Sequence, residues 1–195
     1  MKLLAGILVL SLLFFSSLSF VAIPHRHKNY NNYHQSAVII MVTKSTEECF
    51  EGKSVLLTGA SGGLGSALAE KLSCCGVSTL ILSGRNKDAL MSVSEKCKKH
   101  SPNCQVEIVT CDLDDKGSVY KLGERALEIC GTVDVLVNNG GVSSRSDFLD
   151  TKLEVDEKLM QINFFSGVSL AKMLVPNMVT QKEGKIIWIS SVQGM

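Results

Sequence analysis

Three glycines in one short segment have the spacing of a phosphate-binding turn. Gly59, Gly63 and Gly65 lie between an apolar run, Val55–Thr58, and a Leu/Ala-rich segment that begins at Leu64. A strand, a tight turn and a helix in this order bring backbone N–H groups and the positive end of the helix dipole close to a pyrophosphate. The spacing is G-x-x-x-G-x-G, a variant of the dinucleotide fingerprint. A close packing point between strand and helix is the alternative, because glycine permits that as well.

An arginine follows the next apolar run, in the sequence Ser83-Gly84-Arg85-Asn86. A site for NAD would place an Asp or Glu here to bind the adenosine ribose. An arginine cannot accept that hydrogen bond, but its guanidinium matches a 2′-phosphate in bidentate fashion. We therefore predict NADP(H), with Arg85 as the main determinant and Ser61 as a helper. The alternative is an arginine in a solvated turn.

Two further loops carry polar residues after predicted strands. Asp112 could bind an adenine edge, or it could cap the following helix together with Asp114; chemistry alone leaves both open. Asn138-Asn139-Gly140-Gly141 ends the next strand at the same carboxyl edge, where doubly wound sheets bind ligands. Two amides and two glycines suit a turn that supports a cofactor, and they equally suit any tight turn.

The elements that must position these residues alternate regularly from Gly52 onward. The predicted strands are Val55–Thr58, Thr79–Ser83, Val106–Thr110, Val133–Val137 and Lys185–Ile189, and the predicted helices are Leu64–Cys75, Lys87–Lys99, Lys116–Ile129 and Asp156–Val175. The last helix is expected to end near Pro176. The strands are continuous apolar runs, as in strands buried on both faces. This pattern predicts an α/β fold with a doubly wound parallel (Rossmann) sheet, incomplete after the fifth strand.

Length and composition fit one globular domain. The chain has 195 residues, of which 45% are hydrophobic and 20% are charged. A formal net charge of +1 gives no reason to expect nucleic acid as a partner. The seven cysteines are odd in number and form no C-x-x-C pair, so we interpret them as reduced thiols.

The N-terminal segment differs from the rest of the chain. Leu3–Ile23 is apolar and, at about 1.5 Å per residue, is long enough as a helix to cross a membrane. We predict a signal peptide or signal anchor over residues 1–23, a linker over 24–49 and the dinucleotide-binding domain over 50–195. The basic flank Arg26–Lys28 favours an anchor in the endoplasmic reticulum membrane with the domain facing the cytosol. Plastid import through a bipartite signal, or other secretion, remains an alternative.

Histidines in the predicted linker raise the question of a metal site. His25, His27 and His34 have no cysteine or acidic residue near them in the sequence. A solvated basic linker explains them better than a metal centre does, so we predict no metal site.

Five motifs together resemble the short-chain dehydrogenase/reductase family. Thr58–Gly65, Asp112, Asn138–Gly141, Asn163 and Ser190–Gly194 occur in that family's order and spacing. The resemblance runs from about residue 50 to the last residue. The apolar N-terminus and the sequences around Asp150 and Ser190 look most like the membrane-anchored dehydrogenase/reductase branch, whose members act on steroids, retinoids or other lipid-like carbonyls.

The resemblance assigns roles to particular residues. It implies a cofactor site made of Thr58, Gly59, Ser61, Gly63, Leu64, Gly65, Asp112, Leu113 and Asn138, and Arg85 and Gly140, singled out above from their own positions, complete the predicted site. Within this set Asp112 and Leu113 would meet the adenine, and Asn138 would stabilise the central strand. Ser191 matches the residue that hydrogen-bonds the substrate oxygen, and Asn163 matches the one that holds a water in the proton relay.

The sequence departs from the family pattern in two places. Gly140 stands where alanine is usual, which removes only a methyl group, so we expect little loss. The Tyr-x-x-x-Lys element, which supplies the acid/base, should begin about thirteen residues beyond Ser191, and the sequence ends at Met195.

We therefore expect an NADP(H)-dependent oxidoreductase that transfers a hydride between nicotinamide and a carbonyl or secondary alcohol, with this 195-residue chain inactive in turnover. The alternative is a non-catalytic dinucleotide-binding protein. The helix predicted over Asp156–Val175 belongs to the face that the family commonly uses to form a homodimer.

Overall fold

The computed structural model describes residues 20–23, 38–41 and 48–190 of the chain. It divides the chain into two units, one of residues 1–49 and 190–195 and one of residues 50–189. In the first unit β1 (Phe20–Ile23) pairs antiparallel with β2 (Val38–Met41). Four residues of the apolar span Leu3–Ile23 and four residues of the predicted linker are thus strands. Both segments are rich in Val and Ile, which favour strands.

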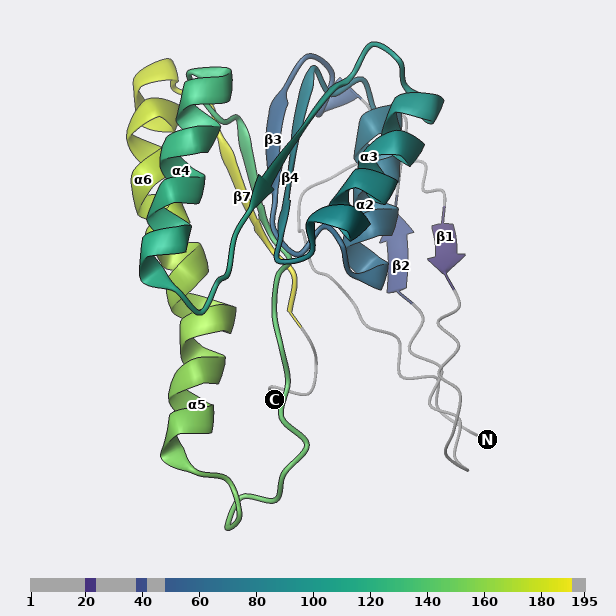
Figure 1. The fold of residues 1–195 in the computed structure, drawn as a ribbon. Coiled ribbons are helices and arrows are strands. Elements are labelled where there is room, and N and C mark those ends of the chain that lie inside the picture. Colours follow the sequence, from purple (N-terminus) through teal and green to yellow (C-terminus); the bar gives the residue numbers. More distant parts are fainter. Residues whose placement is uncertain (1–19, 24–37, 42–47, 191–195) are drawn as a thin grey trace. The chain divides into compact units, whose positions relative to one another are not determined.

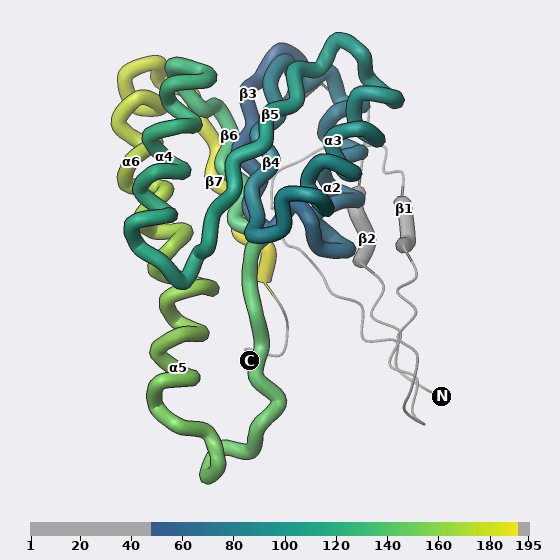
Figure 2. Tube along the Cα trace, in the orientation of Figure 1, coloured from purple at the N-terminus to yellow at the C-terminus, as the bar shows by residue number. Residues whose placement is uncertain are grey.

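The second unit is built on a five-stranded parallel sheet. Its strands are β3 (Ser54–Leu57), β4 (Thr79–Gly84), β5 (Gln105–Thr110), β6 (Val135–Asn138) and β7 (Lys185–Trp188). They lie in the order β5-β4-β3-β6-β7, and every pair is parallel (Figure 2). The predicted doubly wound parallel sheet is confirmed, and the chain's first apolar run of this unit, β3, occupies its centre.

Helices cover both faces of this sheet (Figure 1). The helices of this unit are α2 (Gly63–Cys74), α3 (Lys87–His100), α4 (Lys116–Cys130), α5 (Leu153–Met160) and α6 (Ser166–Gln181), with the π-helical turn η1 (Gln161–Phe165) between the last two. Helices α2 and α3 lie on one face, and α4 and α6 lie on the other.

Alternate strand residues enter two separate cores. Val55 and Leu57 pack with residues of α2 and α3, whereas Leu56 between them packs with α4 and α6. The neighbouring strands repeat this pattern, with Leu80 and Leu82 on the first side and Ile81 on the second. Because both faces are buried, the strands need apolar side chains at every position, which explains their continuous apolar runs.

The segment predicted as one helix over Asp156–Val175 is built differently. It consists of α5, the π turn η1 and α6, and Pro176 lies inside α6 rather than at its end. The prediction was wrong because Leu174 and Met178, on either side of the proline, are both buried in the core. That packing keeps the helix going past the missing N–H group. The helix ends at Gln181, and its C-cap residue Lys182 has a φ of 60°.

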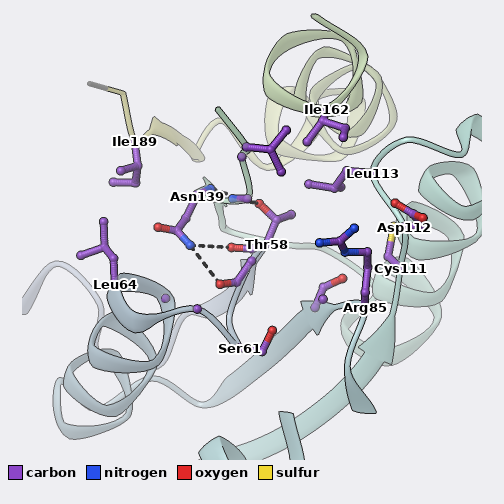
Figure 3. A pocket seen from close by; sticks show the side chains of 18 of the residues that line it. Thr58, Ser61, Leu64, Arg85, Cys111, Asp112, Leu113, Asn139, Ile162 and Ile189 are labelled. Carbon is purple, nitrogen blue, oxygen red and sulfur yellow. Dashed lines mark hydrogen bonds between the residues drawn. The ribbon is translucent and has the colours of Figure 1, made fainter. Parts of the chain in front are cut away.

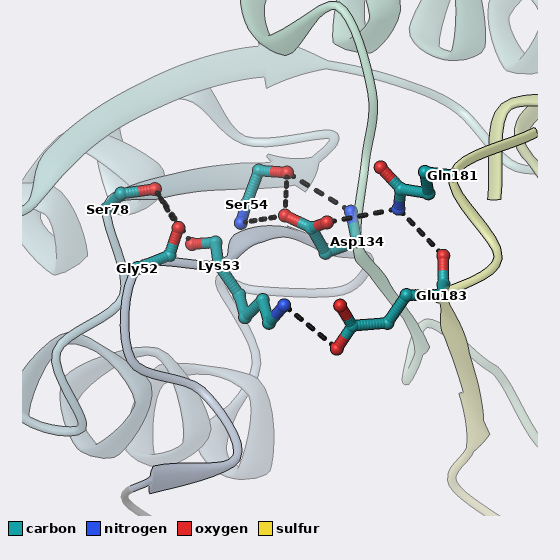
Figure 4. Close-up of polar contacts among 7 residues, drawn as sticks. All are labelled: Gly52, Lys53, Ser54, Ser78, Asp134, Gln181 and Glu183. Carbon is teal, nitrogen blue, oxygen red and sulfur yellow. Dashed lines mark hydrogen bonds and ion pairs between the residues drawn. The ribbon is translucent and has the colours of Figure 1, made fainter.

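A polar cluster joins the amino ends of β3, β6 and β7 (Figure 4). The Asp134 carboxylate accepts hydrogen bonds from the Ser54 backbone N–H at 2.7 Å, from the Ser54 hydroxyl at 2.8 Å and from the Gln181 amide at 3.1 Å. Lys53 forms an ion pair with Glu183 at 2.8 Å nearby. These contacts fix the sheet at the edge opposite to the carboxyl ends of its strands.

Several predictions concern residues outside the described part of the chain. They are most of the apolar span Leu3–Ile23, the histidines of the linker, and Ser191. Among the described residues, no helix has the length and apolar character needed to cross a membrane. The same part of the chain contains no group of three or more His, Cys, Asp or Glu side chains able to hold a metal ion.

Candidate functional site

A cleft of about 370 Å³ lies at the carboxyl edge of the sheet (Figure 3). Of the residues predicted to bind the cofactor, all but Asn138 line it. Leu64 and Ile189 lie at one end of the cleft, and Arg85, Asp112 and Leu113 gather at the other. The loops after β3, β4, β5 and β6 therefore meet around one space, as expected for the carboxyl edge of a doubly wound sheet.

The glycine turn after β3 requires its glycines for two reasons. Gly59 has a φ of 64°, and a Cβ atom placed on it would lie 2.6 Å from the Gly140 Cα. A Cβ atom on Gly65 would overlap the Gly59 carbonyl oxygen. The turn is thus folded tightly against both its own helix and the loop after β6, which a side chain at either position would prevent.

The start of α2 offers backbone donors to the cleft. Its N-cap is Gly62, which supplies no side-chain hydrogen bond, and Gly63, Leu64 and Gly65 of its first turn line the cleft. The first N–H groups of a helix have no partner within the helix, and they carry the positive end of its dipole. This end of the cleft is suited to an anion such as a phosphate.

Hydrogen bonds between Thr58 and Asn139 close the floor of the cleft. The Thr58 hydroxyl accepts from the backbone N–H groups of Asn139 and Gly140, both at 3.0 Å. The Asn139 side-chain amide donates to the carbonyl oxygens of Thr58 at 3.0 Å and Gly59 at 3.2 Å. Four bonds thus join the ends of β3 and β6, two strands that meet from opposite halves of the sequence.

Arg85, just beyond the end of β4, and Ser61, in the loop after β3, both line the cleft. Arg85 is exposed, and Ser61 is partly buried. A Cβ atom on Gly84 would lie 3.0 Å from the Ser61 hydroxyl oxygen, so the glycine before Arg85 leaves room for the Ser61 side chain. An exposed guanidinium and a hydroxyl that line the same cleft can each bind a phosphate that enters it.

The loop after β5 shows that neither Asp112 nor Asp114 caps α4. Asp115 is the N-cap, and its carboxylate accepts from the N–H groups of Gly117 at 2.9 Å and Ser118 at 3.2 Å. The Asp112 carboxylate instead accepts from the Asp114 N–H at 3.1 Å and faces the cleft. Of the two roles left open for Asp112, capping is wrong, because the cap lies one residue beyond Asp114.

Leu113 occupies the space that Gly140 leaves. A Cβ atom on Gly140 would lie 2.5 Å from the Leu113 Cδ1 atom. The glycine in place of alanine is therefore matched by the position of this leucine, and adding the methyl group would displace Leu113. The prediction that glycine in place of alanine at position 140 has little effect did not take the contact with Leu113 into account.

Asn163 lies beside the cleft and anchors one of its loops. Its side-chain oxygen accepts from the Val142 N–H, and its amide donates to the Val142 carbonyl, both at 2.8 Å. Val142 lines the cleft, whereas Asn163 does not, and its neighbour Ile162 is buried and does. π-Helical turns such as η1 occur often at functional sites.

Sequence reasoning missed several residues of the cleft, of which Asn139 is the most important. It singled out Asn138, whose side chain is buried away from the cleft and has an amide nitrogen without a hydrogen-bond partner among the described residues. The strand register gives no signal for it, because Leu57 pairs with Val137 and Asn138 is therefore the residue across from Thr58. Asn139 acquires its role only through its hydrogen bonds to Thr58 and Gly59, just beyond the end of β6.

One cysteine, Cys111, lines the cleft. Burial raises the pKa of its thiol; a hydrogen bond from Ser118 lowers it, and the charges of Asp112 and Asp115 raise it further. The net direction is upward, so Cys111 is a neutral thiol at neutral pH and is not activated as a nucleophile.

Sequence comparisons place this chain near a set of known enzymes. A profile of the family described as short chain dehydrogenase matches residues 53–195. Dehydrogenase/reductase SDR family protein 7-like of Anopheles gambiae is 44% identical over 146 residues, which is 73% of this chain and 46% of that protein. Dehydrogenase/reductase SDR family member 7 of Homo sapiens is 41% identical over 143 residues, which is 72% of this chain and 42% of that protein. The chain thus spans about half the length of the curated relatives it matches.

Solved structures with the same fold include complexes with nicotinamide cofactors. A short-chain dehydrogenase from Sphingobium yanoikuyae in complex with NADPH is 30% identical with a TM-score of 0.67, over 73% of this chain and 55% of that one. A 3-oxoacyl (acyl-carrier-protein) reductase from Agrobacterium tumefaciens with NADP bound is 27% identical with a TM-score of 0.69, over 75% of this chain and 55% of that one.

Proposed function

Since the chain belongs to the short-chain dehydrogenase family, we propose that its cleft binds NADP(H) for hydride transfer between the nicotinamide and a carbonyl or secondary alcohol. The observation that carries this proposal is the glycine turn at the start of α2, where three residues of the first helical turn line a cleft. The pyrophosphate would lie on these N–H groups. When bound, the cofactor supplies the hydride chemistry, and the chain supplies binding and orientation.

Arg85 supports a preference for the phosphorylated cofactor. Its guanidinium lies at the end of the cleft formed by the loops after β4 and β5, and Ser61 lines the same cleft. A 2′-phosphate at this position would accept charge-assisted hydrogen bonds from Arg85 and a further one from Ser61. The ribose hydroxyl of NADH gives the arginine no negative charge to bind.

Titration of the purified chain with NADPH and NADH tests this preference. We expect tighter binding of NADPH, and Arg85→Ala should weaken NADPH binding by about 10- to 100-fold, since hydrogen bonds to charged groups contribute about 1.5–3 kcal/mol. The affinity for NADH should change little. Arg125→Ala is the matched control, because Arg125 lies on an exposed face of α4 and pairs with Glu128 at 2.8 Å.

Equal or tighter binding of NADH by the unmodified chain would contradict the NADP(H) assignment. The same holds if Arg85→Ala leaves the ratio of the two affinities unchanged. Failure of the chain to bind either dinucleotide would contradict the proposed function itself.

We propose a catalytic role for two residues, Ser191 and Asn163. Ser191 would orient the substrate oxygen, and Asn163 would hold a water in the proton relay. Although both amide atoms of Asn163 bind Val142, its oxygen keeps a second lone pair and its nitrogen a second N–H group. Asn163 is exposed, so a water can reach these positions.

The wider context of the reaction is proposed from the same family relationship. The substrate would be lipid-like, and the apolar N-terminus would attach the protein to the endoplasmic reticulum membrane.

The segment Asp156–Val175, which runs from α5 through η1 into α6, would take part in a homodimer. Exposed apolar side chains in this segment, with Met160 at 47% and Phe165 at 49%, support this point. Size-exclusion chromatography with light scattering would show a monomer if it is wrong.

A dinucleotide-binding protein without turnover is the alternative, because the cleft described above serves binding alone equally well. Measuring affinity and NADPH oxidation separately on one preparation distinguishes the two. Binding without turnover of any carbonyl tested supports the alternative for this chain, and measurable turnover excludes it.

A further inference from the structure

Two side chains at the junction of α5 and η1 hold the loop that forms one wall of the cleft. We propose that Lys158 and Gln161 are positioning residues for the adenine half of the cofactor, acting through the loop Cys111–Asp115. This inference rests on the proposed function, since it concerns the affinity of the same cleft. It assigns α5 and η1 a role in cofactor binding through residues that do not act on the substrate.

Gln161 provides the first anchor. Its side-chain amide donates a hydrogen bond of 3.2 Å to the Leu113 carbonyl oxygen, across 48 positions in the sequence. The bond is partly buried, so water competes with it only in part. Leu113 lines the cleft, and its backbone position is therefore tied to the first residue of η1.

Lys158 provides the second anchor, three residues before Gln161 on the same side of the helix. Its ammonium group lies 2.9 Å from the Asp114 carboxylate, and the two side chains are 57% and 35% exposed. An ion pair this exposed contributes little to the stability of the fold. The ion pair acts instead on the position of the loop, because Lys158 holds Asp114 while Gln161 holds the preceding residue, Leu113.

Gly140 confines Leu113 from the other side. The Leu113 side chain fills the space where a Cβ atom of Gly140 would stand, with the Cδ1 atom 2.5 Å from that position. The leucine is thus held between the backbone of the loop after β6 and the two anchors on α5 and η1. A shift of the anchored loop would move the surface that the adenine is proposed to contact.

One short segment therefore touches both walls of the cleft. Gln161 binds the loop after β5, Asn163 binds the loop after β6, and Ile162 between them is buried at 5% exposure and lines the cleft. Because the anchors differ, the two walls can be disturbed separately. Lys158 and Gln161 should affect only the adenine side.

The test measures the affinity of the full chain for adenosine 2′,5′-bisphosphate, which contains the adenine half alone, and for NADPH. Gln161→Leu keeps the size of the side chain but removes the donor, and we expect both dissociation constants to rise about fivefold, as for the loss of one neutral hydrogen bond. Gln181→Leu is the matched control, because Gln181 binds Asp134 at the opposite edge of the sheet. It should leave both affinities unchanged.

A charge exchange separates positioning from a structural role. Lys158→Glu should weaken adenosine bisphosphate binding about threefold through repulsion from Asp114, and adding Asp114→Lys should restore it to within about twofold. Destabilisation of the fold alone would not be reversed in this way.

The outcomes decide between the two proposals. If the unmodified chain binds neither ligand, the proposed function fails and this inference fails with it. If it binds both and Gln161→Leu binds them equally well, only the positioning role is wrong. A charge exchange that gives no recovery also overturns the inference, whereas the fivefold loss together with recovery supports it.

Discussion

At the scale of single residues, Gly59 has the strictest requirement in the cleft. Its φ of 64° disfavours any side chain, and the position of a Cβ atom falls on the backbone of Gly140, which cannot move aside as a flexible side chain could. The close approach of these two backbones brings the glycine turn against the loop after β6. The floor of the cleft depends on that approach.

We therefore predict that Gly59→Ala reduces NADPH affinity by at least about tenfold and lowers the free energy of unfolding by about 1–3 kcal/mol. Gly117→Ala is the control, because Gly117 does not line the cleft and its Cβ atom would meet only the Asp115 carboxylate at 3.4 Å, an ordinary contact distance. Titration with NADPH and urea unfolding of both variants provide the measurement. Equal effects of the two substitutions would show that space at Gly59 is not limiting.

Single residues also show how far the sequence predicts the site. The turn from Thr58 to Gly65 was predictable, because a glycine pattern after an apolar run encodes a backbone shape that depends on few distant contacts. Asn139 was not, since its importance comes from bonds to Thr58, 81 positions away. The N-cap of α4 was not predicted at Asp115, because Asp112, Asp114 and Asp115 lie within four positions and the sequence does not show which of them caps the helix.

At the scale of elements, the packing of α6 on the sheet depends on Gly167. A Cβ atom on this residue would lie 2.5 Å from Trp188 Cη2 and 2.9 Å from Asn138 Cγ. Helix α6 therefore approaches β6 and β7 more closely than a residue with a side chain would permit. Two effects oppose each other here, because alanine favours the helix by about 1 kcal/mol while overpacking costs about 1–3 kcal/mol.

We predict that overpacking dominates, so that Gly167→Ala lowers the free energy of unfolding by about 1 kcal/mol. Gly117→Ala in α4 is the matched control, since its Cβ atom would meet only the Asp115 carboxylate at 3.4 Å. That variant should gain up to about 1 kcal/mol from helix propensity alone. Urea unfolding checks both values, and a stabilised Gly167→Ala would refute the close packing.

Helices and strands were predictable where the spacing of apolar residues in the sequence matches the faces that the segment buries in the fold. The five parallel strands followed from apolar runs such as Val55–Leu57, since burial on both faces leaves a direct mark on the sequence. The π turn at Gln161–Phe165 leaves no such mark, because a change of hydrogen-bond register does not alter the helical spacing of apolar residues enough to be read. Helix α6 continues through Pro176 because Leu174 and Met178, on either side of it, are buried in the core, and the sequence alone does not show that burial.

At the scale of the whole molecule, the Asp134 cluster links stability to pH. Burial raises the pKa of this carboxyl, but hydrogen bonds from Ser54 and Gln181 and the charge of Lys53 outweigh it, so the net pKa is lowered. A lowered pKa in the folded state means that the carboxylate stabilises the fold fully above its unfolded pKa of about 3.9. That contribution is lost as the pH falls through the folded pKa.

We predict that Asp134→Asn is less stable than the unmodified chain at about pH 7 and that the difference shrinks below about pH 3.9. Urea unfolding at several pH values gives the comparison. Glu124→Gln, at an exposed position in the interior of α4, is a control that should change the stability little at any pH. A difference that stays constant down to about pH 2 would contradict the role of the charge.

The bonds between Thr58 and Asn139 have a consequence for the order of folding. The strands β3, β4 and β5 follow one another in the sequence and pair as neighbours, whereas β6 joins β3 only after a loop of nearly 80 positions has closed. Closing that loop costs more entropy, so β6 should join late. The cleft takes its walls from both parts and therefore forms at that late step. A bound dinucleotide would hold the two parts together and slow unfolding, so the cofactor would act on the lifetime of the folded chain as well as on its chemistry.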